Sequence, residues 1–429
     1  MLVVDAREAP PRLDLRSYWR LDYEPKLTAS REDLRERLDY EVGEAVRLRL
    51  ASDVPLGAFL SGGIDSSIVV ALMARESTAP VKTFSIGFDD RGYDELVHAR
   101  RVARLWETDH HEHVVDPDAV AILPLLARHY GEPFADSSSV PSYYLSRETR
   151  TAVTVALNGD GGDECFAGYD RHRAAAVAER LNRVGLGRAA AGLRVFPDSS
   201  SPKSRLRRVR RFAEAARLPF AERYGAWMSY FGAEDKRSLY DPSFANGGTT
   251  AASDERWLRL VDETEGLGPM DRAAAIDVGS YLPNDLLVKM DIAAMANSLE
   301  CRSPFLDHQV LEFTARLPER FKRHGADSKV LLKETFGRLL PKENLARSKM
   351  GFGVPLARWF RGPLDEMVDD TLLASDSRSC DFLRRDALRR YSAEHRSGRA
   401  DHSQRLWALL MLETWLREVV ERDPQVAPT

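Results

Sequence analysis

Residues 59–67 read Phe-Leu-Ser-Gly-Gly-Ile-Asp-Ser-Ser and lie between a short apolar run and the start of a helical pattern. The apolar run at 53–60 predicts a buried strand, bounded by Pro55 and by the two glycines. Beyond the glycines, apolar residues recur at helical spacing, namely Ile68, Val69, Leu72 and Met73. The sequence therefore predicts a tight turn that joins a strand to a helix.

This turn has the chemistry of a site for a pyrophosphate group. Gly62 and Gly63 permit positive φ angles and let backbone N–H groups approach an anion without a Cβ in the way. Ser61, Ser66 and Ser67 add hydroxyl donors, and the start of the helix adds partial positive charge. The alternative is an ordinary serine-glycine turn, but both glycines and all the polar positions fit one role as a phosphate-binding loop.

The turn has no lysine and lacks the spacing of the common P-loop of nucleoside triphosphatases. Asp65 puts a carboxylate in place of that lysine. Because a carboxylate tolerates neighbouring phosphates only with a cation between them, the sequence predicts Mg²⁺ at Asp65. The pattern resembles the pyrophosphate loop of the N-type ATP pyrophosphatases, which implies cleavage of ATP between its α and β phosphates to leave an adenylate.

Composition limits the classes of protein that fit. The chain has 429 residues, 43% hydrophobic and 30% charged, which predicts two globular domains. The net charge of −4 argues against a nucleic-acid partner. Apolar stretches fall short of the roughly 20 residues that span a membrane, so we expect a cytoplasmic protein without a membrane partner. The three cysteines, Cys165, Cys301 and Cys380, are widely scattered and fit a reducing compartment.

Further strands are predicted at 81–88, 112–115 and 151–157, and helices at 34–50, 94–106, 117–130 and 142–151. Strands that alternate with helices over 51–170 predict an α/β fold, a parallel sheet with helices on both faces. Ligands of such sheets bind at the carboxyl ends of the strands, so the loops that begin at Leu60, Ile86 and Leu157 are expected to share one site. We expect a connector arm at 1–29, this α/β core at 30–170, and a mainly helical part at 171–429.

A second motif follows the last of these strands. Residues 158–169 read Asn-Gly-Asp-Gly-Gly-Asp-Glu-Cys-Phe-Ala-Gly-Tyr. Three crowded carboxylates raise one another's pKa unless a cation relieves them, so we expect Asp163 to complete the Mg²⁺ site with Asp65. The glycines let the backbone lie against adenosine or phosphate. A solvated acidic turn is the less favoured alternative.

Together the two motifs resemble the synthetase domain of the glutamine-hydrolysing asparagine synthetase family. Further stretches agree, at 83–88, 132–141, 281–291, 295–300, 302–308 and 349–355, and the resemblance covers roughly 15–420. It implies the adenine nucleotide alpha hydrolase-like fold of the PP-loop ATP pyrophosphatases, with a mostly helical C-terminal part. It also implies an ATP-dependent carbon-nitrogen ligase that adenylates the side chain of aspartate and then forms the amide with ammonia.

The resemblance implies roles for individual residues. It places ATP contacts at Leu60, Ser61, Gly62, Gly63, Asp65, Ser66, Ile86, Asn158 and Gly159, magnesium at Asp65 and Asp163, and catalytic roles at Asp160, near the acyl adenylate, and Lys349, near the triphosphate. Physical chemistry agrees, since a lysine can stabilise the charge that develops between the phosphates.

Substrate contacts are expected at Asp136 and Ser137 in the polar loop 132–141. Arg302 is the expected carboxylate binder because of its fork geometry. A buried ion-pair network is the alternative for Arg302 and its charged neighbours, namely Asp285, Lys289, Asp291, Glu300 and Asp307. Other functions stay open, namely an amide-forming enzyme for another carboxylate, an inactive partner subunit and, disfavoured by charge, an RNA-modifying pyrophosphatase.

Two-domain members of the family begin with a glutaminase domain, whereas only 60 residues precede the phosphate loop here. We expect that domain to be missing and ammonia to come from solution or from a separate glutaminase chain. A gene fragment, a truncated chain and a natural stand-alone synthetase all fit, as does a homodimer.

Three other patterns receive structural interpretations. The run His110-His111-Glu112-His113 would put two ligands on one strand face without an obvious third, so a structural role is favoured over a metal site. Gly185-Leu186-Gly187 is interpreted as a helix break. The run 205–211, rich in arginine, is interpreted as a solvated helix face, with anion or partner docking as the alternative.

Overall fold

The computed structural model describes residues 1–7, 10–88, 95–115, 118, 120–186, 205–245, 250–347 and 353–421. Its centre is a five-stranded sheet in the order β5-β4-β3-β6-β7, with every neighbouring pair parallel. The strands are β3 (Leu56–Phe59), β4 (Lys82–Gly87), β5 (Asp109–Val114), β6 (Val155–Leu157) and β7 (Glu300–Arg302). The predicted parallel sheet with flanking helices is confirmed.

The strand order reverses beside β3. The chain passes from β3 outward to β4 and β5, and then returns to the other side of β3 as β6. Such a reversal leaves a crevice between the loops that leave the two central strands. β7 was not predicted, because three residues within a long helical pattern carry no strand signal; its pairing with β6 brings a segment from beyond residue 171 into the sheet.

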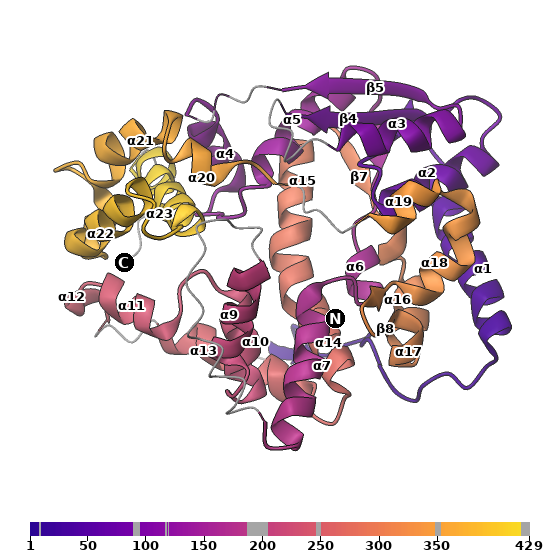
Figure 1. The fold of residues 1–429 in the computed structure, drawn as a ribbon, viewed down its shortest axis with the longest axis horizontal. Helices are drawn as coiled ribbons and strands as arrows, with labels where there is room; N and C mark the ends of the chain where they lie inside the picture. The colour runs from indigo at the N-terminus through magenta and orange to yellow at the C-terminus, as the bar shows by residue number, and fades with distance from the viewer. Residues whose placement is uncertain are drawn as a thin grey trace.

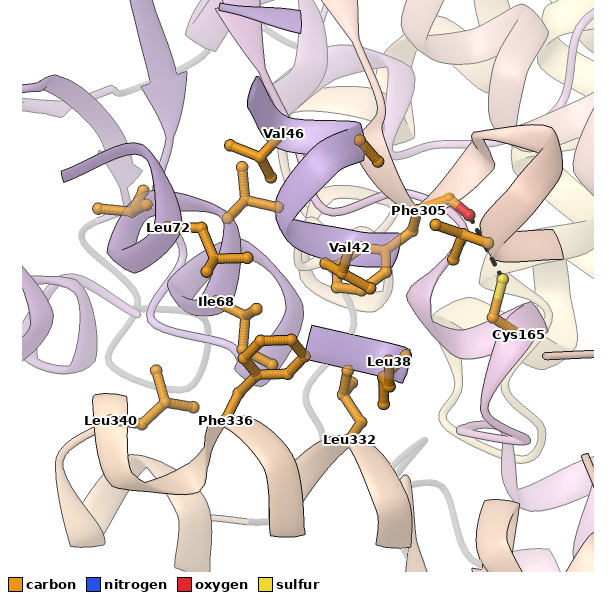
Figure 2. Close-up of a cluster of buried hydrophobic side chains, with 14 of the residues drawn as sticks. Leu38, Val42, Val46, Ile68, Leu72, Cys165, Phe305, Leu332, Phe336 and Leu340 are labelled. Atoms are coloured by element: carbon orange, nitrogen blue, oxygen red, sulfur yellow. Dashed lines mark hydrogen bonds between the residues drawn. The ribbon is translucent and has the colours of Figure 1, made fainter. Parts of the chain in front are cut away.

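Helices cover both faces of the sheet. On one face α1 (Arg31–Arg49), α2 (Ile64–Glu76) and α3 (Leu96–Leu105) pack with α16 (His308–Ala315) and α18 (Val330–Phe336). Figure 2 shows this core, in which Leu38 and Val42 of α1 lie near Ile68 of α2 and Phe336 of α18. Ser30 begins α1 with a capping box, since its side chain accepts from the Asp33 N–H and Asp33 accepts from the Ser30 N–H.

The opposite face carries α5 (Ser139–Arg150) and α15 (Leu287–Met295). Its core includes Phe59, Phe84, Leu145 and Met290. Ala58 and Leu60 belong to the first core and Phe59 to the second, as the alternation of side chains along a strand requires. The residues of β3 therefore anchor the phosphate loop to both layers.

A long helix crosses the molecule beside this face (Figure 1). It runs through α14 (Pro269–Ile276), the π-helical segment η2 (Asp277–Leu286) and α15. The π segment contains Pro283, whose missing N–H removes one helical hydrogen bond. Wide helical turns of this kind are frequent at functional sites.

Of the remaining helices, α4 (Ile122–Tyr130) and α6 (Gly162–Cys165) lie within the predicted α/β core, and the others form the mostly helical C-terminal part that the sequence predicted. These others are α7 (Asp170–Arg183), α9 (Arg205–Ala215), α10 (Phe220–Met228), α11 (Ala233–Leu239), α12 (Pro242–Ala245), α13 (Thr250–Glu263), α17 (Glu319–Lys322), α19 (Lys342–Ala346), α20 (Leu356–Trp359), α21 (Pro363–Met367), α22 (Arg385–Arg396) and α23 (Ser403–Trp415). In Figure 1, α20–α23 lie at the left, across α15 from the sheet.

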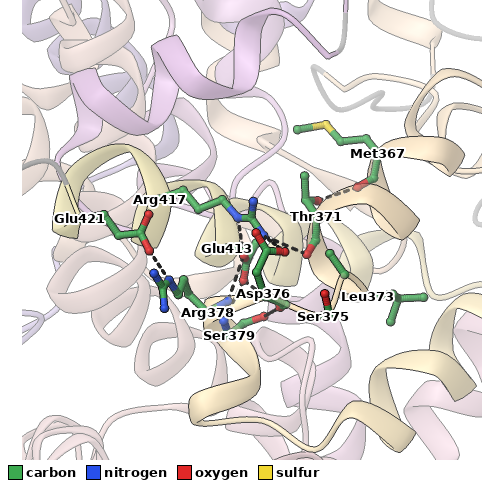
Figure 3. Close-up of polar contacts among 12 residues, drawn as sticks. Met367, Thr371, Leu373, Ser375, Asp376, Arg378, Ser379, Glu413, Arg417 and Glu421 are labelled. Atoms are coloured by element: carbon green, nitrogen blue, oxygen red, sulfur yellow. Dashed lines mark hydrogen bonds and ion pairs between the residues drawn. The ribbon is translucent and has the colours of Figure 1, made fainter.

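A buried carboxylate holds the C-terminal helices together (Figure 3). Glu413 on α23 accepts from the backbone N–H groups of Arg378, at 3.1 Å, and Ser379, at 2.7 Å, and from Nε of Arg417 at 2.6 Å. Burial alone would raise the pKa of Glu413, but these donors outweigh it and lower the pKa. Within the described residues, the structure contains no helix long and apolar enough to span a membrane.

The N-terminal arm carries a ribbon that the sequence did not predict. Strands β1 (Leu2–Asp5) and β2 (Arg12–Leu15) pair antiparallel, with Leu2 opposite Leu15. Most of their side chains are exposed. Short strands without a buried face lack the periodicity on which strand prediction depends. The function of residues 1–29 as a connector stays a prediction, as do the domain boundaries.

Candidate active site

The two sequence motifs meet at the reversal of strand order. The loop after β3 and the loop after β6 press together so closely that side chains would not fit between them. A Cβ on Gly159 would lie 2.7 Å from the Ser66 nitrogen, and a Cβ on Gly162 would lie 2.5 Å from Cγ of Asp65. The glycines of the second motif therefore let segments about 100 residues apart in the sequence share one site.

The phosphate loop has the predicted strand-turn-helix form. Gly62 takes a positive φ of 69°, and a Cβ there would lie 2.4 Å from the His98 carbonyl carbon. Gly63 differs from the prediction because it has extended backbone and caps α2. The amide of Asn344 donates to the carbonyls of Gly62, at 2.9 Å, and His98, at 3.0 Å, and so holds the turn against α3.

Two carboxylates meet one cation at the bottom of the loop. The ammonium of Lys329 contacts Asp65 and, at 2.8 Å, Asp163. The Lys329 side chain is 7% exposed. Burial opposes the charged form of Lys329, but the two carboxylates outweigh it and raise its pKa above the ordinary lysine value. Both predicted metal ligands therefore surround one cation position.

Asp160 lies close enough to Asp65, Asp163 and Lys289 to interact with their charges. Its carboxylate accepts from the Asn158 amide at 2.9 Å, and Ser303 Oγ donates to the Asn158 amide oxygen at 2.7 Å. Burial, together with the charges of Asp65 and Asp163, raises the pKa of Asp160, while Lys289 opposes the rise. Asp160 is therefore a carboxyl group that can hold a proton more readily than an exposed aspartate.

These residues line a cavity of about 460 Å³. Its phosphate end is polar and includes Ser61, Asp65, Lys329, Lys333 and Arg347. Beside it lies an apolar wall of Phe59, Phe84, Ile86, Leu145 and Met290. A third part of the lining, which we call the far wall, contains Asp136, Lys289 and Tyr281.

The far wall combines both signs of charge. The Lys289 ammonium lies 3.5 Å from Asp136, and Asp136 accepts from Ser138 Oγ at 2.7 Å and from the Ser138 N–H at 2.9 Å. Asp285, from the π segment, lies against Asp136. Burial and the Asp136 carboxylate raise the pKa of Asp285 to about 7. The phenol of Tyr130 donates to the Lys289 carbonyl at 2.9 Å, which fixes α15 at this wall.

The sequence matches the asparagine synthase family over residues 37–417. The chain belongs to the asparagine synthase family. It is 29% identical over 410 residues to "Asparagine synthetase [glutamine-hydrolyzing] 1" of Bacillus subtilis. This match covers 94% of this chain and 62% of that protein. It is 34% identical over 397 residues to a putative asparagine synthetase of Mycobacterium tuberculosis, covering 90% and 58%.

The chain thus spans about 60% of the length of these relatives. Not all similar proteins carry the same name. "Amidase chyE" of Penicillium rubens is 27% identical over 422 residues, covering 87% of this chain and 60% of that protein. Membership of the asparagine synthase family therefore leaves the carboxylate substrate open.

The structure brings together most of the residues that family resemblance had implied. Those on the cavity wall are Leu60, Ser61, Gly63, Asp65, Ser66, Ile86, Asp136, Asn158, Gly159, Asp160 and Asp163. Gly62 does not line the cavity, but its positive φ forms the turn of the phosphate loop. Ser137 is buried but does not line the cavity, where Ser138 stands instead. Lys349 lies outside the described residues, two positions beyond Arg347 on the cavity wall.

Arg302 does not line the cavity, and its predicted contact with substrate stays a prediction. Its Nη1 donates to the carbonyls of Arg49 and Ala51, each at 2.8 Å, and its Nε donates to Glu300 at 2.6 Å. The guanidinium fork that suits a carboxylate also suits a pair of carbonyls. These contacts fit the alternative of a structural role for Arg302.

Lys329, Lys333 and Arg347 were missed, because a lysine or an arginine outside a motif has no spacing signal. The left-handed backbone of Lys329, with φ 57°, is equally invisible in the sequence. Among the described residues, no cluster of three metal-ligating side chains is found. His110 bonds Thr83 Oγ1 at 2.8 Å, and His111 stacks on Phe84 with ring centroids 5.0 Å apart, contacts that fit a structural role.

The arginine-rich run begins α9, and the side chains of 205–208 lie outside the described residues. Arg211 donates to the Trp227 carbonyl at 2.6 Å, and Arg210 pairs with Glu214 at 2.9 Å. The Arg211 contact attaches α9 to α10, whereas the Arg210 pair lies within α9. Gly185 has a φ of 74° just after α7 ends, in line with the predicted helix break, and Gly187 lies outside the described residues.

Proposed function

We propose that this chain is an ATP-dependent ligase that adenylates the side-chain carboxylate of aspartate and then forms asparagine with ammonia. The observation that carries the proposal is the cavity itself. A phosphate loop, two carboxylates around one cation and an apolar wall form one part of its lining, and a mixed-charge wall forms another. ATP and a small zwitterionic acid fit these two parts.

The nucleotide is proposed to lie along the sheet edge. Adenine is an apolar ring, so the wall of Phe59, Phe84 and Ile86 suits it, as buried apolar area stabilises a bound ligand. The phosphates then reach Ser61, the start of α2, Lys329 just before α18 and Lys333 within it. A helix N-terminus stabilises anions there, which accounts for a turn with no lysine of its own.

Asp65 and Asp163 fit a divalent cation, because carboxylate oxygens are hard ligands and both already converge on one positive charge. When bound, Mg²⁺ would neutralise the pyrophosphate leaving group. The chain's own cations share that task. Lys329, Lys333 and Arg347 face the phosphate end, and Lys349 is proposed to join them. Their charge favours departure of pyrophosphate as a carboxylate oxygen of the substrate attacks the α phosphorus.

The far wall is proposed to hold the amino-acid head of aspartate. Lys289 suits the α-carboxylate, and Asp136, with Asp285 behind it, suits the α-ammonium. The side-chain carboxyl then points along the cavity toward the phosphates. In the second step ammonia attacks the carbonyl carbon of the adenylate, AMP leaves, and one proton must be lost from nitrogen. Asp160, with its raised pKa, is proposed to accept that proton.

One alternative function has an observation in its favour. A relative named as an amidase has a similar overall sequence match, so another carboxylate could take the place of aspartate in the same reaction. The far wall then decides the substrate. An inactive partner subunit is the remaining alternative. The source of ammonia, a separate glutaminase chain and a homodimer stay predictions.

The first experiment measures pyrophosphate release from ATP with Mg²⁺, ammonium and a panel of carboxylic acids, with the amide identified by mass spectrometry. We expect asparagine and AMP in equal amounts with aspartate and ammonium, and no product when glutamine replaces ammonium. Turnover with another acid alone would assign the amidase-type alternative. No pyrophosphate with any acid would overturn the ligase proposal. The Asp65→Asn variant serves as the control for contaminating ATPases.

A further inference from the structure

Lys329 has an unusual position for a residue that faces phosphates. Its ammonium sits between Asp65 and Asp163, the two carboxylates that fit a metal, and not on the open side of the cavity. The three side chains are largely buried, with exposed fractions of 7% for Lys329 and 17% for each aspartate. Two carboxylates this close would repel each other strongly without a cation, because solvent screens them little.

The backbone around this contact is shaped to make it possible. Lys329 has a φ of 57°, which is costly for a residue with a Cβ. Gly168 lies beside the pair, and a Cβ there would come 1.8 Å from Asp163 Oδ1 and 2.6 Å from Cε of Lys329. Ala167 has a positive φ of 51° as well. The backbone is strained on both sides of the ion pair, and a glycine makes room for it. Such strain is typical of functional sites, so we interpret this contact as a functional one.

We infer that Lys329 occupies the cation position of the nucleotide-free enzyme and excludes free divalent metal from it. Metal then enters only together with ATP. The triphosphate brings negative charge that draws the Lys329 ammonium away from the carboxylates, and the metal takes the position that the ammonium leaves. The lysine changes partners, and no covalent bond forms or breaks.

The consequence is a site selective for the metal-nucleotide complex over the free metal. One monovalent cation on two carboxylates leaves one negative charge, which limits repulsion of the incoming triphosphate. A divalent ion bound in advance would fill the site, and its ligands would have to rearrange for ATP. A lysine on a flexible stem can swing between the two arrangements. This inference rests on the proposed function only for the identity of the nucleotide.

The test measures binding of Mn²⁺ alone, without nucleotide, by isothermal titration calorimetry. Lys329→Met should bind Mn²⁺ about tenfold or more tightly than the unmodified protein, because its competitor is gone. Lys333→Met is the matched control. It removes the same charge one helical turn away, from a residue paired with Asp327, and should leave Mn²⁺ affinity within about twofold. Equal Mn²⁺ affinity for Lys329→Met and the unmodified protein would overturn the inference.

A second measurement guards against a destabilised variant. Lys329→Met leaves two carboxylates without their cation, so its melting temperature should fall, and Mn²⁺ should raise it more than it raises that of the unmodified protein. Affinity for Mg²⁺ with a non-cleavable ATP analogue should fall in the same variant, because a phosphate contact is lost. Loss of stability that Mn²⁺ fails to restore would contradict the competition. These binding measurements need no acid substrate, so a chain without ligase activity could still pass them.

Discussion

At the phosphate end of the cavity, most functional groups come from two short segments, residues 61–66 and 158–163, whereas the far wall draws Asp136 from a loop and Tyr281 and Lys289 from a long helix about 150 residues further along the chain. The phosphate end places backbone groups, helix ends and small side chains, and it needs glycines at close contacts. The far wall places long charged side chains. The comparison teaches that short stretches of sequence suffice to predict a phosphate site. The choice of acid substrate depends instead on how distant elements pack.

The largest effect is expected at the phosphate end. Asp65→Asn removes one of the two carboxylates that surround the cation, and with it the charge on which a metal depends. Pyrophosphate release should fall by about 100-fold or more, since a bound metal contributes several kcal/mol to such a transition state. Steady-state measurement of pyrophosphate checks this, and unchanged release would show that the two motifs do not share a metal.

The next effect tests the close contact between the two motifs. In Gly159→Ala, the new Cβ would lie 2.7 Å from the Ser66 nitrogen, so one loop must shift. A shift of this size misaligns reacting groups and should lower turnover by about 10- to 100-fold.

The matched control for Gly159→Ala is Gly43→Ala, inside α1, where a Cβ would meet nothing within 4 Å. That variant should keep full activity and gain about 0.5–1 kcal/mol in the free energy of unfolding, since alanine is the better helix residue. Equal kinetics for the two alanine variants would contradict the role given to the contact.

A smaller effect, on pH dependence, is expected at the far wall. The pKa of Asp285 is raised to about 7, and an ammonium group binds the ionised form. The KM for aspartate should therefore fall as pH rises from 6 to 8, and Asp285→Asn should raise KM and remove this dependence. The charged and titratable groups around Asp285 are Asp136, Lys289, Arg171, Tyr130, Tyr230 and Tyr281. A KM profile that Asp285→Asn leaves unchanged would argue against an ammonium at this wall.

The pH dependence of the free energy of unfolding tests the raised pKa of Asp285 independently. Because the folded pKa of Asp285 lies above the ordinary value of about 4, the folded state holds its proton between these two pH values while the unfolded state has lost it. The stabilising contribution is full below pH 4 and is lost as pH rises through 7. Chemical denaturation of Asp285→Asn should show a smaller loss of stability than the unmodified protein between pH 5 and 8.

The smallest kinetic effect is expected at Arg302. Its guanidinium holds the carbonyls of Arg49 and Ala51, away from the cavity. Arg302→Met should lower the free energy of unfolding by about 1–3 kcal/mol, because two carbonyls lose their partner. The KM for aspartate should stay the same. A large rise in KM with normal stability would return Arg302 to the substrate site.

Much of the fold could be predicted from the sequence, because runs and spacings of apolar residues along consecutive positions indicate strands and helices. The apolar run before Ser61, the helical spacing after Gly63 and the strand before Asn158 predicted a parallel sheet and a loop site at its carboxyl edge. β7 escaped prediction, since three residues give no period. The ribbon of β1 and β2 escaped it as well, because its side chains are mostly exposed on both faces.

The sequence by itself determined the turns of the phosphate loop and the acidic loop, because a positive φ is a requirement that Gly62 and Gly161 meet locally. Only the tertiary structure decided which partners the long charged side chains take. Lys329 reaches two carboxylates more than 160 residues away, and Arg302 turns to carbonyls at the end of α1. A flexible cation binds whichever acceptors the fold brings within its reach, and spacing along the chain does not record that choice.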